Sequence, residues 1–149
     1  MLQIDIARRP DGSTALRCTR ADGSVTWQKQ TTQAAFFVLH DLTHYAVETT
    51  LGYRRGFFGL IAEGWDAEDT TGKGARGKLP MEAVEVEQLV GLFDSERGSG
   101  TLWTADEFNA FAPRRLTQEQ ILHVRALRAR LFEQWFALQP GEKLELQFG

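Results

Sequence analysis

Apolar and polar side chains alternate at both ends of the chain. The alternation covers residues 2–6 and returns at residues 144–148, and a period of two is typical of a strand with one buried face. Two Asp-Gly-Ser turns, at 11–13 and 22–24, divide residues 2–29 into three strands. We therefore expect a three-stranded N-terminal meander, with a C-terminal strand that can rejoin the same sheet.

Between these strands the apolar positions recur with the longer period of helices. The pattern predicts helices over residues 31–51, 53–66, 80–98, 104–111 and 117–138, the second of them short and interrupted by glycines. The spacing indicates a single α+β domain over residues 1–149: an antiparallel β-meander of three N-terminal strands plus a C-terminal strand, packed against four to five helices on one face.

Three local features refine these boundaries. Thr31 or Thr32 is expected to cap the first long helix, and Gly52 to end it. The segment Thr117-Gln118-Glu119-Gln120 predicts a capping box in front of the last helix. Residues 67–78 are polar and rich in glycine, so we expect a mobile loop there.

Composition excludes several classes of protein. With 42% hydrophobic and 25% charged residues, the 149-residue chain resembles an ordinary globular protein, and no apolar run is long enough to cross a membrane. The net charge of -3 argues against a nucleic-acid partner. Cys18 is the only cysteine, which excludes an internal disulfide and a cysteine-based zinc site. No segment resembles a signal peptide, so we expect a cytoplasmic location.

The first long helix is mostly apolar but carries one ionisable stripe. At about 100° per residue, His40, Asp41, His44 and Glu48 fall within an arc of roughly 100°. Histidines four residues apart lie about 6 Å apart along a helix axis, so both imidazoles can reach one ion at roughly 2.0–2.1 Å from nitrogen. The stripe therefore favours a divalent metal site, with zinc as the first candidate.

The segment His40-Asp41-x-x-His44 resembles the H-E-x-x-H motif of zinc-dependent metallopeptidases, over five residues only. The resemblance implies that His40 and His44 bind the metal and that Asp41 acts as the general base on bound water. Asp replaces the motif's Glu and is one methylene shorter. Because a misplacement of about 1 Å can cost on the order of a hundredfold in rate, metal binding is the stronger expectation and hydrolysis the weaker one.

A third ligand has to come from another part of the chain. Glu63 lies 19 residues after His44, a spacing similar to that of the third ligand in the Glu-liganded branch of that peptidase class. Asp66 and Glu48 are the alternatives. Glu48 lies about 12 Å from His40 along the helix axis, so we expect it to accept a hydrogen bond from His44 instead.

Two other interpretations compete with the metal site. The stripe can be an ordinary solvated helix face, in a non-catalytic interaction domain that forms a homodimer through exposed aromatic residues. It can also bind a small ligand beneath the loop Gly72–Lys78. His123 is expected to be structural, and the glutamates of the 80–98 helix (Glu82, Glu85 and Glu87) to form a solvated face.

Overall fold

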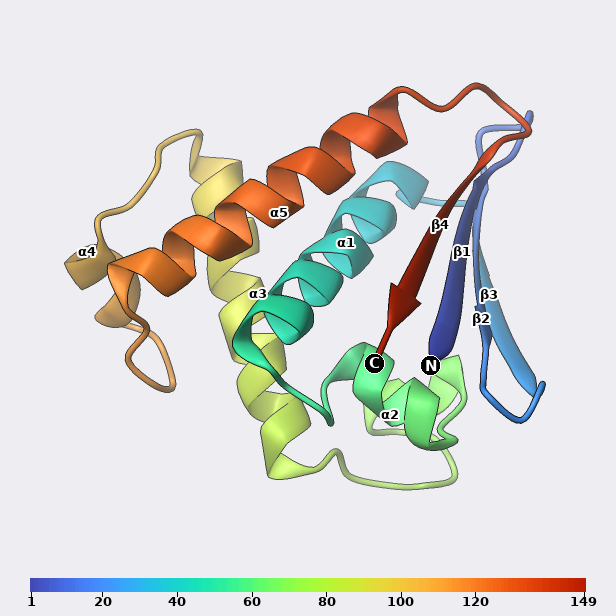
Figure 1. The fold of residues 1–149 in the computed structure, drawn as a ribbon, viewed down its shortest axis with the longest axis horizontal. Helices are drawn as coiled ribbons and strands as arrows, with labels where there is room; N and C mark the ends of the chain where they lie inside the picture. The colour runs from blue at the N-terminus through green and yellow to red at the C-terminus, as the bar shows by residue number, and fades with distance from the viewer.

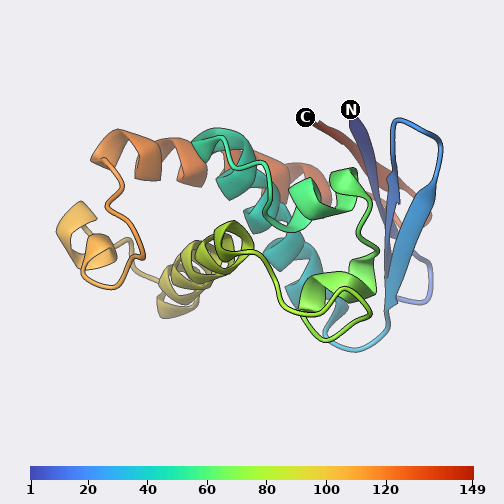
Figure 2. The same ribbon diagram turned by 90° about the horizontal axis from the view of Figure 1, so that it is seen from below.

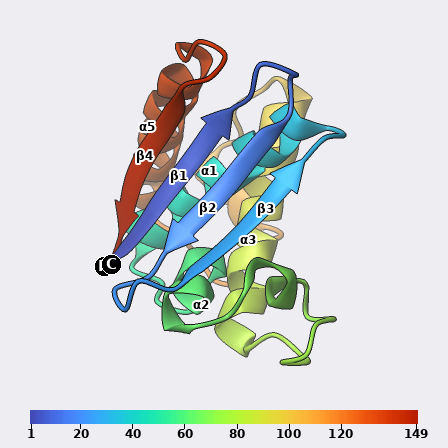
Figure 3. The same ribbon diagram turned by 90° about the vertical axis from the view of Figure 1, so that its right-hand side faces the viewer.

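The alternating segments form one antiparallel sheet in the computed structural model, which describes residues 1–149. The strands are β1 (Leu2–Arg8), β2 (Thr14–Thr19), β3 (Val25–Gln30) and β4 (Lys143–Phe148), in the order β3-β2-β1-β4 (Figure 3). Ile4 pairs with Cys18 on one side and with Leu146 on the other, so all three face the helices. The predicted meander and the return of the C-terminal strand are confirmed.

The two Asp-Gly-Ser turns have the same construction. In each turn the aspartate carboxylate accepts hydrogen bonds from the backbone N–H and the hydroxyl of the serine two residues later, at 2.9 and 2.6 Å. The intervening glycines, Gly12 and Gly23, have φ of 85° and 86°, a conformation that strains any residue with a Cβ. Local chemistry therefore sets the register of the hairpins.

All helices lie on one face of the sheet (Figure 1 and Figure 2). They are α1 (Ala34–Leu51), α2 (Phe57–Glu63), α3 (Met81–Ser99), α4 (Ala105–Asn109) and α5 (Gln118–Phe136), with a 3-10 helix η1 (Ala67–Thr71) between α2 and α3. Gly52 ends α1, and the Thr117 capping box is present. Two local expectations need correction: η1 occupies part of the predicted loop, and Gln33, in a left-handed conformation, precedes α1 in place of a threonine cap.

Helix α1 lies between two apolar cores. Val38 and Leu42 belong to the cluster beneath the sheet, which α2 and α5 complete. Ala46 and Val47 belong to a second cluster, shared with α3, α4 and α5. Because α1 is covered on both sides, His40, Asp41 and His44 of its ionisable stripe line a cavity between α3 and the inner face of β3. None of the helices is long and apolar enough to cross a membrane.

Candidate metal centre

The stripe on α1 meets a carboxylate from α3. His40 and His44, one turn apart on α1, each offer a ring nitrogen, and Glu87 offers a carboxylate oxygen. These three atoms all lie within 4.8 Å of one another. Two imidazoles and one carboxylate form a ligand set that zinc and related divalent ions use in proteins.

His44 is held between two carboxylates. Its side chain is only 1% exposed, and its Nδ1 lies 3.1 Å from Oε2 of Glu48. Its Nε2 lies 2.8 Å from Oε1 of Glu87, yet this buried nitrogen has no well-aligned hydrogen bond. A buried polar nitrogen without an aligned partner is uncommon, and a cation between Nε2 and Glu87 would satisfy it.

The surroundings of His44 favour positive charge at this position. Burial by itself lowers the pKa of the imidazole, but the hydrogen bond to Glu48, the close contact with Glu87 and the negative charges of both outweigh it and raise the pKa to about 10. The same contact with His44 lowers the pKa of Glu87. Without a metal ion, a proton therefore supplies the positive charge between the two carboxylates.

His40 has a comparable carboxylate partner. Its Nδ1 lies 2.7 Å from Oδ2 of Asp94 on α3, and the Asp94 side chain is 14% exposed. With Nδ1 of each ring bound by a carboxylate, Nε2 is the nitrogen left for a ligand bond in both histidines. Such partners fix the ring orientation and the tautomer of metal-binding histidines.

Glu48 links the centre to the start of α2. Besides His44, its buried carboxylate accepts hydrogen bonds from the backbone N–H groups of Phe57, Phe58 and Gly59, at 2.9 to 3.2 Å. A Cβ at Gly56 would lie 2.5 Å from the Glu48 carboxyl carbon, so only glycine fits at that position. The expected hydrogen bond between Glu48 and His44 is confirmed, and α2 fixes the carboxylate that makes it.

The three candidate ligands line a cavity of about 350 Å³. Its walls come from α1, α3, β3, the start of α2 and the segment around η1. A cavity of this size lies within the usual range of small-molecule sites. An ion bound by the three side chains would therefore be accessible to a small ligand.

Asp41 lines the same cavity, next to His40 in the chain. Burial raises the pKa of its carboxyl to about 7, against the opposing effect of positive charge on His44 and His40. The structure thus brings Asp41 to the same space as the two histidines, as the motif requires of a base.

The other sequence candidates lie elsewhere. Glu63 makes a two-point ion pair with Arg55, at 2.9 and 3.0 Å, and does not join the two imidazoles. Asp66 caps η1 and pairs with Arg20. His123 is exposed on α5, where its Nε2 lies 4.0 Å from Oε1 of Glu119.

The sequence interpretation missed Glu87 and Asp94. It assigned the glutamates of α3 to a solvated face, but Glu82 accepts hydrogen bonds from the backbone of Arg54, Glu85 accepts one from the Tyr53 hydroxyl, and Glu87 contacts His44. Glu87 and Asp94 are seven residues apart, which is about two helical turns and places them on one face of α3. That spacing was the available indication, but acidic pairs at this spacing are too common to single out one helix.

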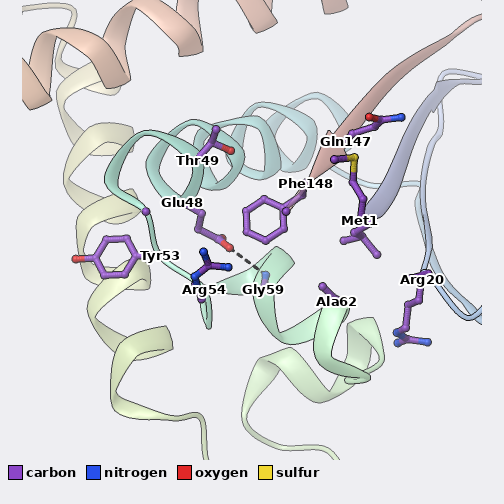
Figure 4. A pocket seen from close by; sticks show the side chains of 14 residues that line it. Met1, Arg20, Glu48, Thr49, Tyr53, Arg54, Gly59, Ala62, Gln147 and Phe148 are labelled. Atoms are coloured by element: carbon purple, nitrogen blue, oxygen red, sulfur yellow. Dashed lines mark hydrogen bonds between the residues drawn. The ribbon is translucent and has the colours of Figure 1, made fainter.

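A second cavity, of about 470 Å³, is lined by Glu48 but by none of the three candidate ligands (Figure 4). It is bordered by the two chain ends, the end of α1 and the start of α2. Glu48 is the only acidic side chain in its wall, no histidine lines it, and the figure shows the carboxylate directed at the Gly59 backbone. This larger cavity therefore lacks a ligand set, and the smaller one carries the candidate centre.

No protein-family model, curated protein or solved structure matched the chain in the three comparisons. A function for this centre has to be argued from its geometry.

Proposed function

We propose that the protein binds one divalent metal ion, with zinc the first candidate, through His40, His44 and Glu87. The observation that carries the proposal is the arrangement of the two imidazoles. A carboxylate holds Nδ1 of each ring, Nε2 of His44 lies 2.8 Å from Glu87, and one nitrogen of each ring lies within 4.8 Å of a Glu87 oxygen. An ordinary solvated face gives no reason for a buried carboxylate, Glu48, and a half-buried one, Asp94, to hold two histidines one helical turn apart.

Small movements would complete the coordination. Ligand atoms about 2.0–2.2 Å from a tetrahedral zinc ion are roughly 3.3 Å apart. The Nε2 to Oε1 pair at 2.8 Å has to open slightly, and the wider pairs, at up to 4.8 Å, have to close. The Glu87 side chain is 46% exposed and can make most of this adjustment. Because all three side chains line the cavity, a fourth ligand would come from the cavity.

Metal analysis of protein purified without an affinity tag tests this proposal. We expect about one zinc ion per chain, lost in His40→Ala and His44→Ala, with Glu87→Gln binding more weakly. Removing a carboxylate partner, as in Asp94→Asn, should weaken binding by about 10- to 100-fold. His123→Ala and Glu63→Ala are the matched controls and should bind zinc like the unchanged chain. Equal losses in His123→Ala and His44→Ala would reject the assignment.

Hydrolysis is the second candidate function, favoured by the position of Asp41 in the wall of the cavity. A divalent ion supplies an acidified water and polarises a carbonyl group, and Asp41 would take the proton. We expect Asp41→Asn to keep zinc while losing a hundredfold or more of any hydrolytic rate, since general base catalysis contributes about 10²- to 10⁴-fold. A variant that hydrolyses ester or amide substrates at the original rate would exclude Asp41 as the base.

The other expectations concern assembly, location and the loop Gly72–Lys78. Trp27, Phe111 and Phe136 are 62%, 78% and 58% exposed, which keeps a homodimer among the proposals. The lone Cys18 continues to favour the reducing cytoplasm. In the loop Gly72–Lys78 no residue lines the candidate cavity, so the geometry favours the metal centre over a loop-based anion site.

A further inference from the structure

The inner face of the sheet changes character at β3. On β1 and β2 the inward positions are apolar residues such as Ile4 and Leu16, as expected beneath helices. On β3 they are Thr26, Gln28 and Gln30, while Trp27 and Lys29 face outward. A packed sheet face gains nothing from glutamine, because an unpartnered carboxamide costs free energy to bury.

Only the first of these three polar residues has a partner within the chain. Thr26 accepts a hydrogen bond from the backbone N–H of Ala67, at 3.0 Å, and thereby attaches η1 to the sheet. Gln28 and Gln30 are half-buried, make no side-chain hydrogen bond within the chain, and both line the cavity of the candidate metal centre. Two residues apart on one strand, their side chains start about 7 Å apart.

The side chains around this cavity, apart from the candidate metal ligands, include no basic group that would bind an anion. Its acidic side chains are Asp41 and Glu87, and neither a lysine nor an arginine lines it. Lys29 and Lys78 each lie next in sequence to a residue of the cavity wall, but Lys29 faces the opposite side of the sheet and Lys78 is exposed on the loop before α3. With zinc held by the two histidines and Glu87, a phosphate or carboxylate ligand would find no lysine or arginine beside the ion and would lie against the carboxyl group of Asp41.

We infer that the ligand of this centre is uncharged and presents an amide group to Gln28 and Gln30. A carboxamide offers both a donor and an acceptor, which matches the donor and acceptor of another amide. Phe37 and Phe57 supply apolar wall on the α1 and α2 sides, so the amide belongs to a small molecule with an apolar or flat remainder. This inference rests on the proposed metal centre and names the class of ligand that the centre faces.

Calorimetry with zinc-loaded and metal-free protein tests the inference. The probes are N-acetylalanine amide for a linear amide and uracil for a ring amide, with N-acetylalanine and inorganic phosphate as the anionic counterparts. We expect at least one amide probe to bind more tightly than both anions. Whichever amide binds better distinguishes a linear from a cyclic source of the group.

Matched variants of β3 assign the binding to the two glutamines. Gln28→Leu and Gln30→Leu keep the side-chain size but remove the hydrogen bonds, so each should weaken amide binding about three- to tenfold. Lys29→Ala, on the same strand but the opposite face, should leave it unchanged. In a nitrogen-15 NMR spectrum, the side-chain NH₂ signals of Gln28 and Gln30 should shift when the amide is added.

Failure of this inference can be distinguished from failure of the metal proposal. Zinc uptake is measured first and alone, and the glutamine variants should retain it. A chain that takes up zinc but binds neither amide, prefers an anion, or binds equally well after both glutamine substitutions contradicts the amide inference only. A chain that takes up no zinc contradicts the metal proposal, and the amide affinity of the metal-free protein then decides the inference separately.

Discussion

At the scale of single residues, the distinctive feature is a buried histidine between two acids. Most buried carboxylates have a partner, and Glu48 has four: three backbone N–H groups and His44. This arrangement fixes the ring of His44 and holds positive charge at one point. Whether a proton or a metal ion supplies that charge depends on pH and on metal concentration.

The zinc affinity should continue to change with pH at values well above the usual pKa of a histidine. The pKa of His44 is raised to about 10 in the metal-free chain, so zinc has to displace a proton at neutral pH. Lower pH favours the proton and higher pH the metal, and apparent affinity should rise by about tenfold per pH unit for each proton released. Competition with a chelating dye at several pH values measures this slope.

Zinc affinities measured above about pH 7.5 distinguish this expectation from that for a ligand histidine with its usual pKa. A histidine with the usual pKa of about 6.5 releases its proton before pH 7.5, so the affinity would then level off. A slope that continues to pH 9 supports the paired arrangement with Glu48 and Glu87. A flat response above pH 7.5 would contradict it.

At the scale of elements, α2 is positioned by close backbone contact. The N–H groups at its start bind Glu48, and its glycine Gly59 lies against the carbonyl of Arg54. A Cβ added at Gly59 would be 2.0 Å from that carbonyl oxygen. In α3, by contrast, a Cβ added at Gly91 meets nothing within 4 Å. Of these two helical glycines, only Gly59 is required by its surroundings.

Alanine substitutions at these two glycines should change stability in opposite directions. Gly91→Ala should raise the free energy of unfolding by about 0.5–1 kcal/mol, because alanine is the better helix former and its methyl group has space. Gly59→Ala should lower it by about 1–3 kcal/mol, as expected for overpacking against backbone.

Urea unfolding of both variants provides the comparison. A neutral Gly59→Ala would show that the start of α2 is not packed as described, and destabilisation by Gly91→Ala would contradict the open space at that position of α3. Gly59→Ala should also weaken zinc binding, because it displaces a donor to Glu48.

At the scale of the whole molecule, the candidate centre joins elements that are far apart in the sequence. His40 and His44 come from α1 and Glu87 from α3, and the cavity is closed by β3 and the segment around η1. A second buried cluster joins α3 to α5, where Glu96 pairs with Arg125 and lies 3.7 Å from Arg128. An ion at the centre would connect α1 to α3, in addition to the link between α3 and α5.

Zinc should raise the thermal stability of the entire chain. A ligand that binds only the folded state stabilises it by about 2.7 kcal/mol at a hundredfold excess over Kd, which corresponds to about 5–10 °C in Tm for a domain of this size. Scanning calorimetry with zinc and with a chelator measures the difference. His44→Ala should show no shift and His123→Ala the full shift. An equal shift in both would place the ion elsewhere.

The sequence by itself determined the helices and strands and two of the three candidate ligands, His40 and His44. Strand alternation, the Asp-Gly-Ser turns, the helical periods and the capping box are local, so they could be predicted from neighbouring residues. The stripe that carries His40, Asp41, His44 and Glu48 follows from helical spacing for the same reason. The hydrogen bond between Glu48 and His44 was predictable because one helical turn joins them.

Only the tertiary structure decided the partners that come from other elements. Glu63 was expected as the third ligand from its distance along the chain, but α2 directs it toward Arg55, and α3 brings Glu87 in its place. Sequence separation does not report how two helices pack, because packing depends on which apolar faces meet. The choice among several similar glutamates was therefore made by the core that α1 shares with α3, which fixes the position of α3.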